Sequence, residues 1–399
     1  MLNYMQEKAV KSFAHWYRNP ESRSRPWFEI SGPAGSGKTF TVKQIIEFLG
    51  LDYDDVLFCA YVGKAALALR LSGVNGRTIH SLIYHPEITY KKDEDDNVIY
   101  GVDGKPERKT VFIKNASLPG NVKLIVVDEG GMVEKNMATD LLSFGIPLLV
   151  LGDLNQLPPV FGQGLFLLKP DIVLNEIMRQ AKDSKIIYLS QLAIHGYPIP
   201  YGRHDKHVQV LRKNDVLNDY DLADEVFGES DMIITHTNTM RDNINRYVRK
   251  RIYHLEGNRI QVGDKIICRK NNWDILLPNY DNEIALVNGM IGYVSDIGRT
   301  AQGMEISFTP DFSNWQSFDE IPFDPNFIFM DYQDRKQVNP MTMSYIPFEF
   351  GYAITCHLSQ GSQAETCCTF SENHFDTIMY RKWLYTAITR AKTNLSLIV

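Results

Sequence analysis

The stretch Ile30-Ser31-Gly32-Pro33-Ala34-Gly35-Ser36-Gly37-Lys38-Thr39 decides the fold of this chain. A short apolar run, Trp27 to Ile30, precedes the glycines and predicts a buried strand. Apolar residues at helical spacing follow them up to Gly50, which predicts a helix closed by a glycine C-cap. A strand, a glycine-rich turn and a helix in this order are the context that a phosphate-binding loop requires.

The residue types in this loop suit a nucleoside triphosphate. Glycines allow backbone N–H groups to turn inward around phosphates, and the following helix N-terminus favours negative charge. Lys38 can reach the outer phosphates, and the Thr39 hydroxyl can hold Mg²⁺. We therefore expect a nucleotide-binding protein in which the phosphates contact Gly32, Pro33, Ala34, Gly35, Ser36, Gly37, Lys38 and Thr39.

Length and composition indicate a soluble protein with more than one core. The chain has 399 residues, and single hydrophobic cores stop growing near about 250–300 residues. The net charge of −6 argues against wholesale coating of nucleic acid but leaves room for a local basic groove. No apolar run approaches the roughly 20 residues of a membrane helix, and the polar N-terminus does not read as a signal peptide. We expect a cytoplasmic protein with reduced cysteines, in which Cys367 and Cys368 point to opposite faces of a strand.

The apolar run 124–127 predicts a buried parallel strand that ends in two carboxylates, Asp128 and Glu129. Beside a phosphate loop, Asp128 can hold Mg²⁺ through water and Glu129 can orient or deprotonate an attacking water. Taken alone, the two carboxylates could equally belong to a capped turn. The next apolar strand, 147–151, leads into the polar segment 152–159. Because such segments face the ligand crevice of an open α/β sheet, we expect Gln156 to sense the γ-phosphate or its attacking water.

Three further polar positions suggest ligand contacts. Gln6 lies in a predicted opening helix and could read an adenine edge through its amide, although a solvated helix glutamine is the alternative. Lys64 follows the predicted strand 56–62. A polar cluster comes next, formed by Thr78, His80 and Ser81. Small, hydroxylated or polar side chains of this kind contact nucleic-acid backbones, although the cluster alone also fits an ordinary loop.

Two stretches interrupt the α/β pattern. Residues 84–117 contain a charge run and short alternating strands, which predict a β-hairpin insertion without a core of its own. Residues 255–347 contain short strands with tight glycine turns, which predict a small SH3-like barrel. The remaining residues are expected to form a first core from 1–83 and 118–180, and a second core from 181–254 and 348–399.

The phosphate loop, the Asp128-Glu129 strand end and Gly152-Asp153-Leu154-Asn155-Gln156-Leu157-Pro158-Pro159 together resemble helicase superfamily one, in its 5′-to-3′ RecD-like branch. Within that branch, the length and the small hairpin are most similar to the Dda helicases of bacteriophages. The matching motifs run from Gln6 to Arg390. The resemblance implies an α/β fold of two RecA-like P-loop NTPase cores with parallel sheets, a β-hairpin wedge in the first core and an SH3-like β-barrel in the second.

The resemblance also implies roles for residues in the second half of the chain. Arg179 and Arg390 match arginine fingers that reach the γ-phosphate. The segment 352–362 matches a family segment that contacts both the DNA backbone and the nucleotide, with Gly361 allowing a close backbone approach. Its candidate DNA contacts are Thr355, His357 and Ser359.

Two positions depart from the family pattern. Gly130 and Gly131 follow the carboxylates where the family usually has a small residue and then a serine, which removes a hydroxyl that could couple the metal site to DNA. Leu358 replaces the usual lysine after His357, which removes one phosphate contact.

The function implied by the resemblance is an ATP-dependent DNA helicase that uses Mg²⁺, translocates 5′ to 3′ on single-stranded DNA and unwinds duplex DNA in replication, recombination or repair. The implied partners are single-stranded DNA, forked duplex DNA and single-strand binding or replisome proteins. We expect a monomer without a membrane partner, in the host-cell cytoplasm if the protein is phage-encoded. The alternatives are a translocase that displaces bound proteins with little unwinding, and an ATP-switched single-strand binding protein.

Overall fold

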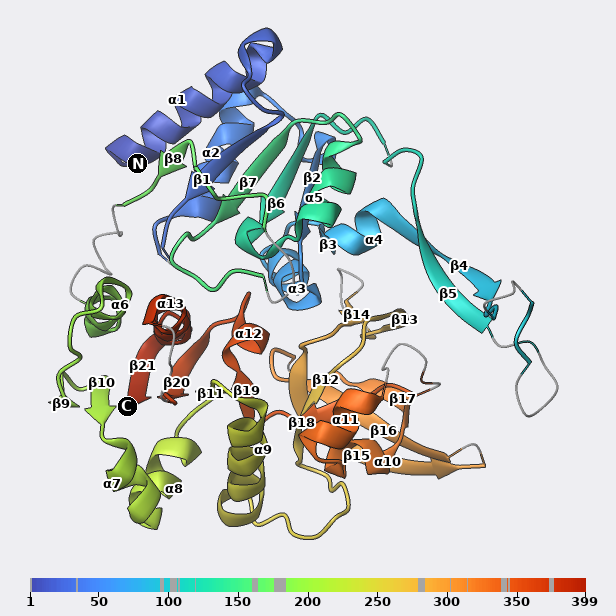
Figure 1. Cartoon of the computed structure of the whole chain (residues 1–399), viewed down its shortest axis with the longest axis vertical. Coiled ribbons are helices and arrows are strands. Elements are labelled where there is room, and N and C mark those ends of the chain that lie inside the picture. Colours follow the sequence, from blue (N-terminus) through green and yellow to red (C-terminus); the bar gives the residue numbers. More distant parts are fainter. Residues whose placement is uncertain are drawn as a thin grey trace.

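The computed structural model describes residues 2–33, 35–93, 97–100, 106, 108–118, 120–159, 164–175, 184–278, 284–301, 303–313, 315–338, 343, 345–372 and 377–399. Figure 1 shows two α/β lobes, one above the other, with the N-terminus in the upper lobe and the C-terminus in the lower. In the part of the chain that is described, no helix is both long and apolar enough to cross a bilayer.

The first core contains a six-stranded sheet in the order β3-β2-β6-β7-β1-β8, in which every pair of neighbours is parallel. The predicted strands before the phosphate loop and before Asp128 are both confirmed. The strands are β1 Trp27–Ser31, β2 Val56–Ala60, β3 Gly76–Thr78, β6 Leu124–Asp128, β7 Leu148–Gly152 and β8 Ile172–Val173. Because the strands are parallel, the carboxyl ends of β1, β6 and β7 lie at one edge of the sheet.

Helices cover both faces of this sheet. The apolar residues of its strands alternate, so that Val126 packs towards one group of helices and Val127 towards the other. The first group is α1 Tyr4–Arg18, α2 Lys38–Leu49 and α3 Gly63–Leu71. The second group is α4 Ile79–Ile83 and α5 Lys135–Leu142. The predicted C-cap is confirmed, since Gly50 follows α2 in the left-handed conformation with φ 67°.

The first insertion is an antiparallel hairpin, β4 Tyr84–Tyr90 and β5 Arg108–Lys114, that projects from the first core (Figure 1). Its base is held by the Tyr84 hydroxyl, which donates to Asp140, and by ring contacts between His80 and Phe112. Its outer part exposes large apolar side chains, with Tyr90 50% and Tyr100 63% accessible. The described residues of this insertion form an antiparallel hairpin, whereas residues 94–96 of the charge run and 101–105 lie outside the described residues. The bounds of the insertion and its role as a wedge stay predictions.

The second core contains a sheet in the order β19-β11-β20-β21-β10-β9, parallel except at the β9 edge. Its strands are β9 Gly202–Arg203, β10 Val208–Leu211, β11 Met232–Thr235, β19 Ala353–Thr355, β20 Ala364–Phe370 and β21 Ala391–Ile398. One face packs against α6 Lys185–His195 and α13 Thr377–Ile388. The other face packs against α7 Lys213–Asn218, α8 Tyr220–Gly228 and α9 Asn238–Tyr247.

The cysteine prediction is confirmed in this sheet. Cys367 packs into the cluster under α6 and α13, whereas Cys368 packs into the cluster under α8 and α9. All five cysteines are free and buried.

The second insertion shares its hydrophobic cluster with the second core, and Leu67 of α3 in the first core also joins that cluster. Its main sheet is antiparallel in the order β17-β16-β15-β12-β18. The bounds are β12 Lys265–Cys268, β13 Asn272–Leu276, β14 Ala285–Leu286, β15 Ile291–Thr300, β16 Gly303–Pro310, β17 Phe318–Phe323, α10 Pro325–Phe329, α11 Tyr332–Gln337 and β18 Phe348–Phe350. Among the described strands, β17 and β18 lie at opposite edges of this sheet and do not pair with each other. Closure into an SH3-like barrel therefore stays a prediction.

Candidate active site

The phosphate-binding loop lies between the carboxyl end of β1 and the N-terminus of α2. Gly35 and Gly37 adopt φ values of 77° and 80°, a conformation that glycine adopts without steric cost. The Lys38 ammonium curls back into the loop and donates to the carbonyls of Gly32 (2.7 Å) and Pro33 (3.2 Å). The loop therefore holds its lysine where phosphate oxygens can replace backbone carbonyls as acceptors. Ala34 lies outside the described residues.

Gln6 is fully buried, so the alternative of a solvated helix glutamine is wrong. Its side chain closes a capping box at the start of α1, where its Oε1 accepts from the Asn3 N–H at 3.0 Å. Its Nε2 donates to the Ser36 carbonyl at 3.1 Å. Gln6 thus ties α1 to the phosphate loop, and an adenine contact by this residue stays a prediction.

Asp128 and Glu129 lie at the carboxyl end of β6, beside the loop. The Asp128 carboxylate accepts from the Glu129 N–H at 2.9 Å, and Glu129 adopts a left-handed φ of 50°, which is uncommon for a residue with a side chain. Burial raises the pKa of Glu129, and the neighbouring Asp128 charge raises it further, whereas Arg390 and Lys38 act in the opposite direction. Glu129 therefore lies within electrostatic reach of cations from both cores.

The glycines after the carboxylates have different surroundings. A Cβ added to Gly130 would lie 2.3 Å from Cγ1 of buried Val150, so no side chain fits at that position. A Cβ added to Gly131 would meet Leu167 at 3.5 Å, which is an ordinary contact. Close packing against β7 therefore explains the glycine at 130, whereas Gly131, which stands where the family usually has the serine, has room for a small side chain.

The segment after β7 lies at the same edge of the sheet. The Leu154 N–H donates to Ser31 Oγ at 3.2 Å, which ties this segment to the end of β1. Gln156 is 8% exposed, and its buried Oε1 receives no hydrogen bond from the described part of the chain. Such an atom is costly to bury unless a ligand or water supplies the missing hydrogen bond.

Arg390 brings the second core to this site. It follows α13, is 3% exposed, and donates to the carbonyls of Thr386 (3.0 Å) and Ser362 (3.1 Å). Its charge acts to lower the pKa of Glu129. Tyr385 and Thr386, just before it in the chain, hydrogen-bond the first-core segment after β7. Arg179 lies outside the described residues.

The predicted DNA contacts on the first core do not all face solvent. Thr78 is 2% exposed, and its hydroxyl caps α4 by accepting from the Ser81 N–H at 3.1 Å. His80 packs its ring against Tyr84 and Phe112 at the base of the hairpin, and burial lowers its pKa. These residues build the junction between α4 and the hairpin, so burial argues against a direct DNA contact by Thr78.

Lys64 lies at the start of α3, where the first core meets the second insertion. A Cβ added to Gly63 would lie 2.9 Å from Val287 Cβ, which shows how closely the two parts approach. Burial lowers the pKa of Lys64 to about 8, although the charge of Asp311 in the second insertion opposes this effect. Lys64 is therefore positioned between the lobes.

The segment 355–361 of the second core also lies at the junction of the lobes. Thr355 is 8% exposed, and burial lowers the pKa of half-buried His357. Ser359 is fully buried and donates to the Cys356 carbonyl at 2.7 Å, which argues against a DNA contact by its hydroxyl. Gly361 has φ 74°, and an added Cβ would lie 2.9 Å from Ala65 Cβ, so its predicted close approach is made to α3 of the first core.

The sequence interpretation missed the contacts that join the two cores at this site. Lys382, Tyr385 and Thr386 of α13 all hydrogen-bond the segment after β7. Tyr385 and Thr386 follow Lys382 by three and four residues, a spacing that places each near Lys382 on the helix surface, but the sequence carries no signal that this surface meets the other core.

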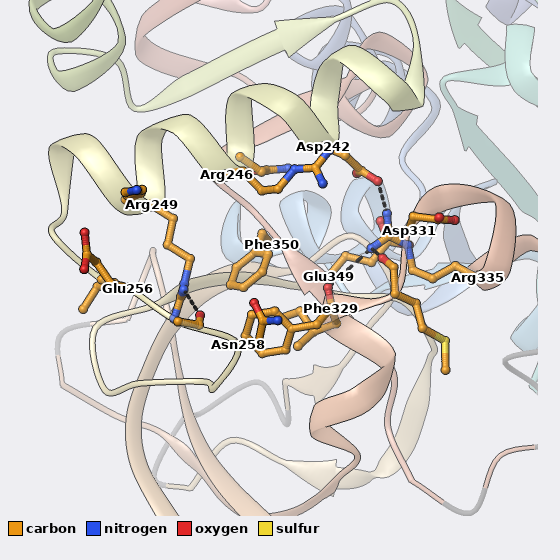
Figure 2. A pocket seen from close by; sticks show the side chains of 16 residues that line it. Asp242, Arg246, Arg249, Glu256, Asn258, Phe329, Asp331, Arg335, Glu349 and Phe350 are labelled. Carbon is orange, nitrogen blue, oxygen red and sulfur yellow. Dashed lines mark hydrogen bonds and ion pairs between the residues drawn. The ribbon is translucent and has the colours of Figure 1, made fainter.

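A separate pocket of about 440 Å³ lies on the second core, outside this site (Figure 2). It is formed between α9 with the following turn Val248–Ile252, the α10–α11 connection and β18. Its arginines are already paired, as Arg249 binds Asp264 at 2.6 Å and Arg335 binds Asp242. These ion pairs anchor the second insertion to the second core.

The donor groups at the sheet edge fit a triphosphate with Mg²⁺. Thr39 and Asp128 offer only oxygen ligands, which Mg²⁺ prefers. Ser36 Oγ and Gln156 Oε1 are buried and have no hydrogen-bond partner among the residues that the structure describes. The fold and this edge together define a P-loop NTPase with two α/β cores.

Comparison with known proteins places the chain within a family. The model of the AAA domain matches residues 1–219, more than half of the chain, and that of the UvrD-like helicase C-terminal domain matches residues 350–398. The protein therefore belongs to the AAA-domain family. Its fold is similar to that of Pif1 helicases. The Dda-like branch stays a prediction.

Individual relatives agree with this placement. The ATP-dependent RecD2 DNA helicase of Deinococcus radiodurans is 26% identical over 388 residues, which cover 91% of this chain but only 45% of that protein. The ATP-dependent DNA helicase Pif1 of Campylobacter jejuni is 23% identical over 413 residues, covering 91% and 86% of the two chains. The structure of Bacteroides Pif1 bound to single-stranded DNA superposes with a TM-score of 0.57 at 16% identity, covering 100% of this chain and 92% of that one.

Proposed function

We propose that this protein is an ATP-dependent DNA helicase that translocates 5′ to 3′ along single-stranded DNA and unwinds duplex DNA. The observation that carries the proposal is the meeting of two cores at one edge. The phosphate loop, Asp128 and Glu129 come from the first core, and Arg390 comes from the second. A site divided in this way couples nucleotide state to the relative position of the cores.

In this proposal each residue at the edge has one role. Lys38 leaves the carbonyls of Gly32 and Pro33 to bind the outer phosphates of ATP. Glu129 and Gln156 orient the attacking water, and Arg390 balances the charge that develops on the γ-phosphate. Mg²⁺ held by Thr39 and Asp128 would neutralise phosphate charge. Arg179 is proposed as a second arginine finger.

Single-stranded DNA is proposed to run across the junction of the lobes, where Lys64, Thr355 and His357 lie. The projecting hairpin is proposed as the wedge at the fork, because its outer part exposes aromatic side chains that can stack on bases. Splitting one base-pair step costs about 1.4 kcal/mol of stacking energy on average. The motor would supply this energy as it advances and drives the fork against the wedge.

The finer assignments extend the same proposal. We assign the protein to the Dda-like branch, with an SH3-like barrel at 255–347 and a role in replication, recombination or repair. We further propose a monomer that works in the cytoplasm on forked DNA, beside single-strand binding or replisome proteins. The two relatives that are ATP-dependent DNA helicases support DNA as the substrate, although the chain spans less than half of the RecD2 relative.

The test uses duplexes that carry either a 5′ or a 3′ single-stranded tail, in DNA and RNA versions. The proposal expects ATP-dependent unwinding of the 5′-tailed DNA duplex only, and none by the Lys38→Ala variant. DNA-stimulated hydrolysis without strand separation would instead support a protein-displacing translocase. ATP binding without hydrolysis would support an ATP-switched single-strand binding protein.

A further inference from the structure

Helix α13 of the second core forms hydrogen bonds with the segment that follows β7 in the first core. The Lys382 ammonium donates to the Leu154 carbonyl at 2.8 Å, and Thr386 Oγ1 accepts from the Leu157 N–H at 3.0 Å. The Leu157 side chain packs into the hydrophobic cluster of the second core. This short segment therefore belongs to the first core by sequence and packs into the second.

Tyr385 makes a further buried contact between the same two segments. The residue is fully buried, and its hydroxyl donates to the Asp153 carboxylate at 2.7 Å. Asp153 is 6% exposed and accepts a second bond from the Asn155 N–H at 3.0 Å. A hydrogen bond to a charged acceptor is strong when water is excluded, and parting the cores would break it.

Both ends of this bond lead directly to hydrolytic residues. On the first core, the Gln156 N–H donates to the Asp153 carbonyl at 3.2 Å. On the second core, the Arg390 Nε donates to the carbonyl of Thr386, the residue after Tyr385. The Tyr385–Asp153 bond thus fixes the distance between the turn that carries Gln156 and the helix end that carries Arg390.

We propose that Tyr385 is a positioning residue for ATP hydrolysis, whose bond to Asp153 aligns Arg390 with Glu129 and Gln156 when the cores close. The inference rests on the proposed function, since it assigns a part of the same site. Tyr385 does not touch the nucleotide in this account. Its hydroxyl fixes the relative position of the two cores, and efficient hydrolysis depends on that position.

The test compares two tyrosines of the same helix. Tyr385→Phe removes the hydroxyl that crosses between the cores. Tyr380→Phe is the matched control, because the Tyr380 hydroxyl pairs with Ser371 inside the second core at 2.7 Å. ATP hydrolysis is measured at saturating single-stranded DNA over a range of ATP concentrations, and thermal unfolding is recorded for each variant.

Tyr385→Phe is expected to lower kcat about 10- to 100-fold, the loss that accompanies removal of a hydrogen bond to a charged group. The dissociation constant for ATP should stay within about twofold, because the phosphate loop lies wholly in the first core. Tyr380→Phe should retain the kcat of the unaltered protein. A lowered unfolding temperature with unchanged kcat for Tyr385→Phe would overturn the proposal, because it would assign the hydroxyl a structural role only.

A second variant keeps the test decisive if Tyr385→Phe folds poorly. Asp153→Asn keeps the shape of the acceptor and should lower kcat by a similar factor. In the double variant the two losses should not multiply, because both remove the same bond. Multiplying losses would overturn the proposal. If the unaltered protein shows no DNA-stimulated hydrolysis, the proposed function fails instead, which separates the two results.

Discussion

Each core contains its own mainly parallel sheet, but the two cores present different chemistry to the edge where they meet. The first core offers a glycine-rich loop, a lysine and two carboxylates, which are groups that hold phosphates, Mg²⁺ and water. The second offers a buried arginine and a helix that grips the first core. From this difference we infer that the first core binds the nucleotide and orients the attacking water, whereas the second core supplies the arginine that completes hydrolysis. Variants in each core should therefore fail in different ways.

The largest effect is expected in the first core. Lys38→Ala removes the cation that reaches the outer phosphates, and should abolish both tight ATP binding and DNA-stimulated hydrolysis. Nucleotide binding by fluorescence and steady-state hydrolysis would measure the two losses. Near-normal turnover in this variant would place the nucleotide elsewhere.

The hairpin supplies neither the nucleotide-binding groups nor the arginine of the second core. Its removal therefore offers a second test of how these roles are divided. Replacing residues 84–117 with a short turn should abolish unwinding of a forked duplex and leave DNA-stimulated hydrolysis largely intact. The physical reason is that the hairpin base contacts α4 and α5, at a distance in the sheet from the phosphate loop. A parallel fall of both activities would make the hairpin a structural element instead.

The smallest expected effect is a change in folding stability at Gly130, which tests the packing of the first core and not its chemistry. Gly130→Ala should lower the free energy of unfolding by about 1–3 kcal/mol, because its Cβ would lie 2.3 Å from Val150. Gly131→Ala is the matched control, whose Cβ meets only an ordinary contact at 3.5 Å, and should change stability by less than about 1 kcal/mol. Chemical denaturation measures both. Equal stability of the two variants would contradict the packing account of Gly130.

Local patterns predicted the elements that carry the nucleotide chemistry. The strand before the loop, the helix after it and the strand that ends at Asp128 are all found, because each depends on periodicity and glycine placement within a few residues. Contacts between distant segments could not be predicted in the same way. The burial of Thr78 and Ser359 and the bond between Tyr385 and Asp153 depend on how the cores pack, which one sequence does not reveal.

The second insertion shows the same limit. Its strands and glycine turns were predicted, and Gly263 and Gly289 do adopt φ values of 91° and 90°. The attachment of this insertion to the second core could not be predicted. From the sequence alone, Arg249 looks like a solvent-exposed basic residue, and only the structure shows that it is buried in an ion pair with Asp264.

The measurement that tests the central claim most directly is single-turnover ATP hydrolysis by an Arg390→Ala variant, beside its equilibrium affinity for ATP. The account predicts affinity within a few-fold of the unaltered protein and hydrolysis slowed by about 10³- to 10⁵-fold, the range known for arginine fingers. Hydrolysis at a near-normal rate would contradict the claim that the second core completes the active site of the first.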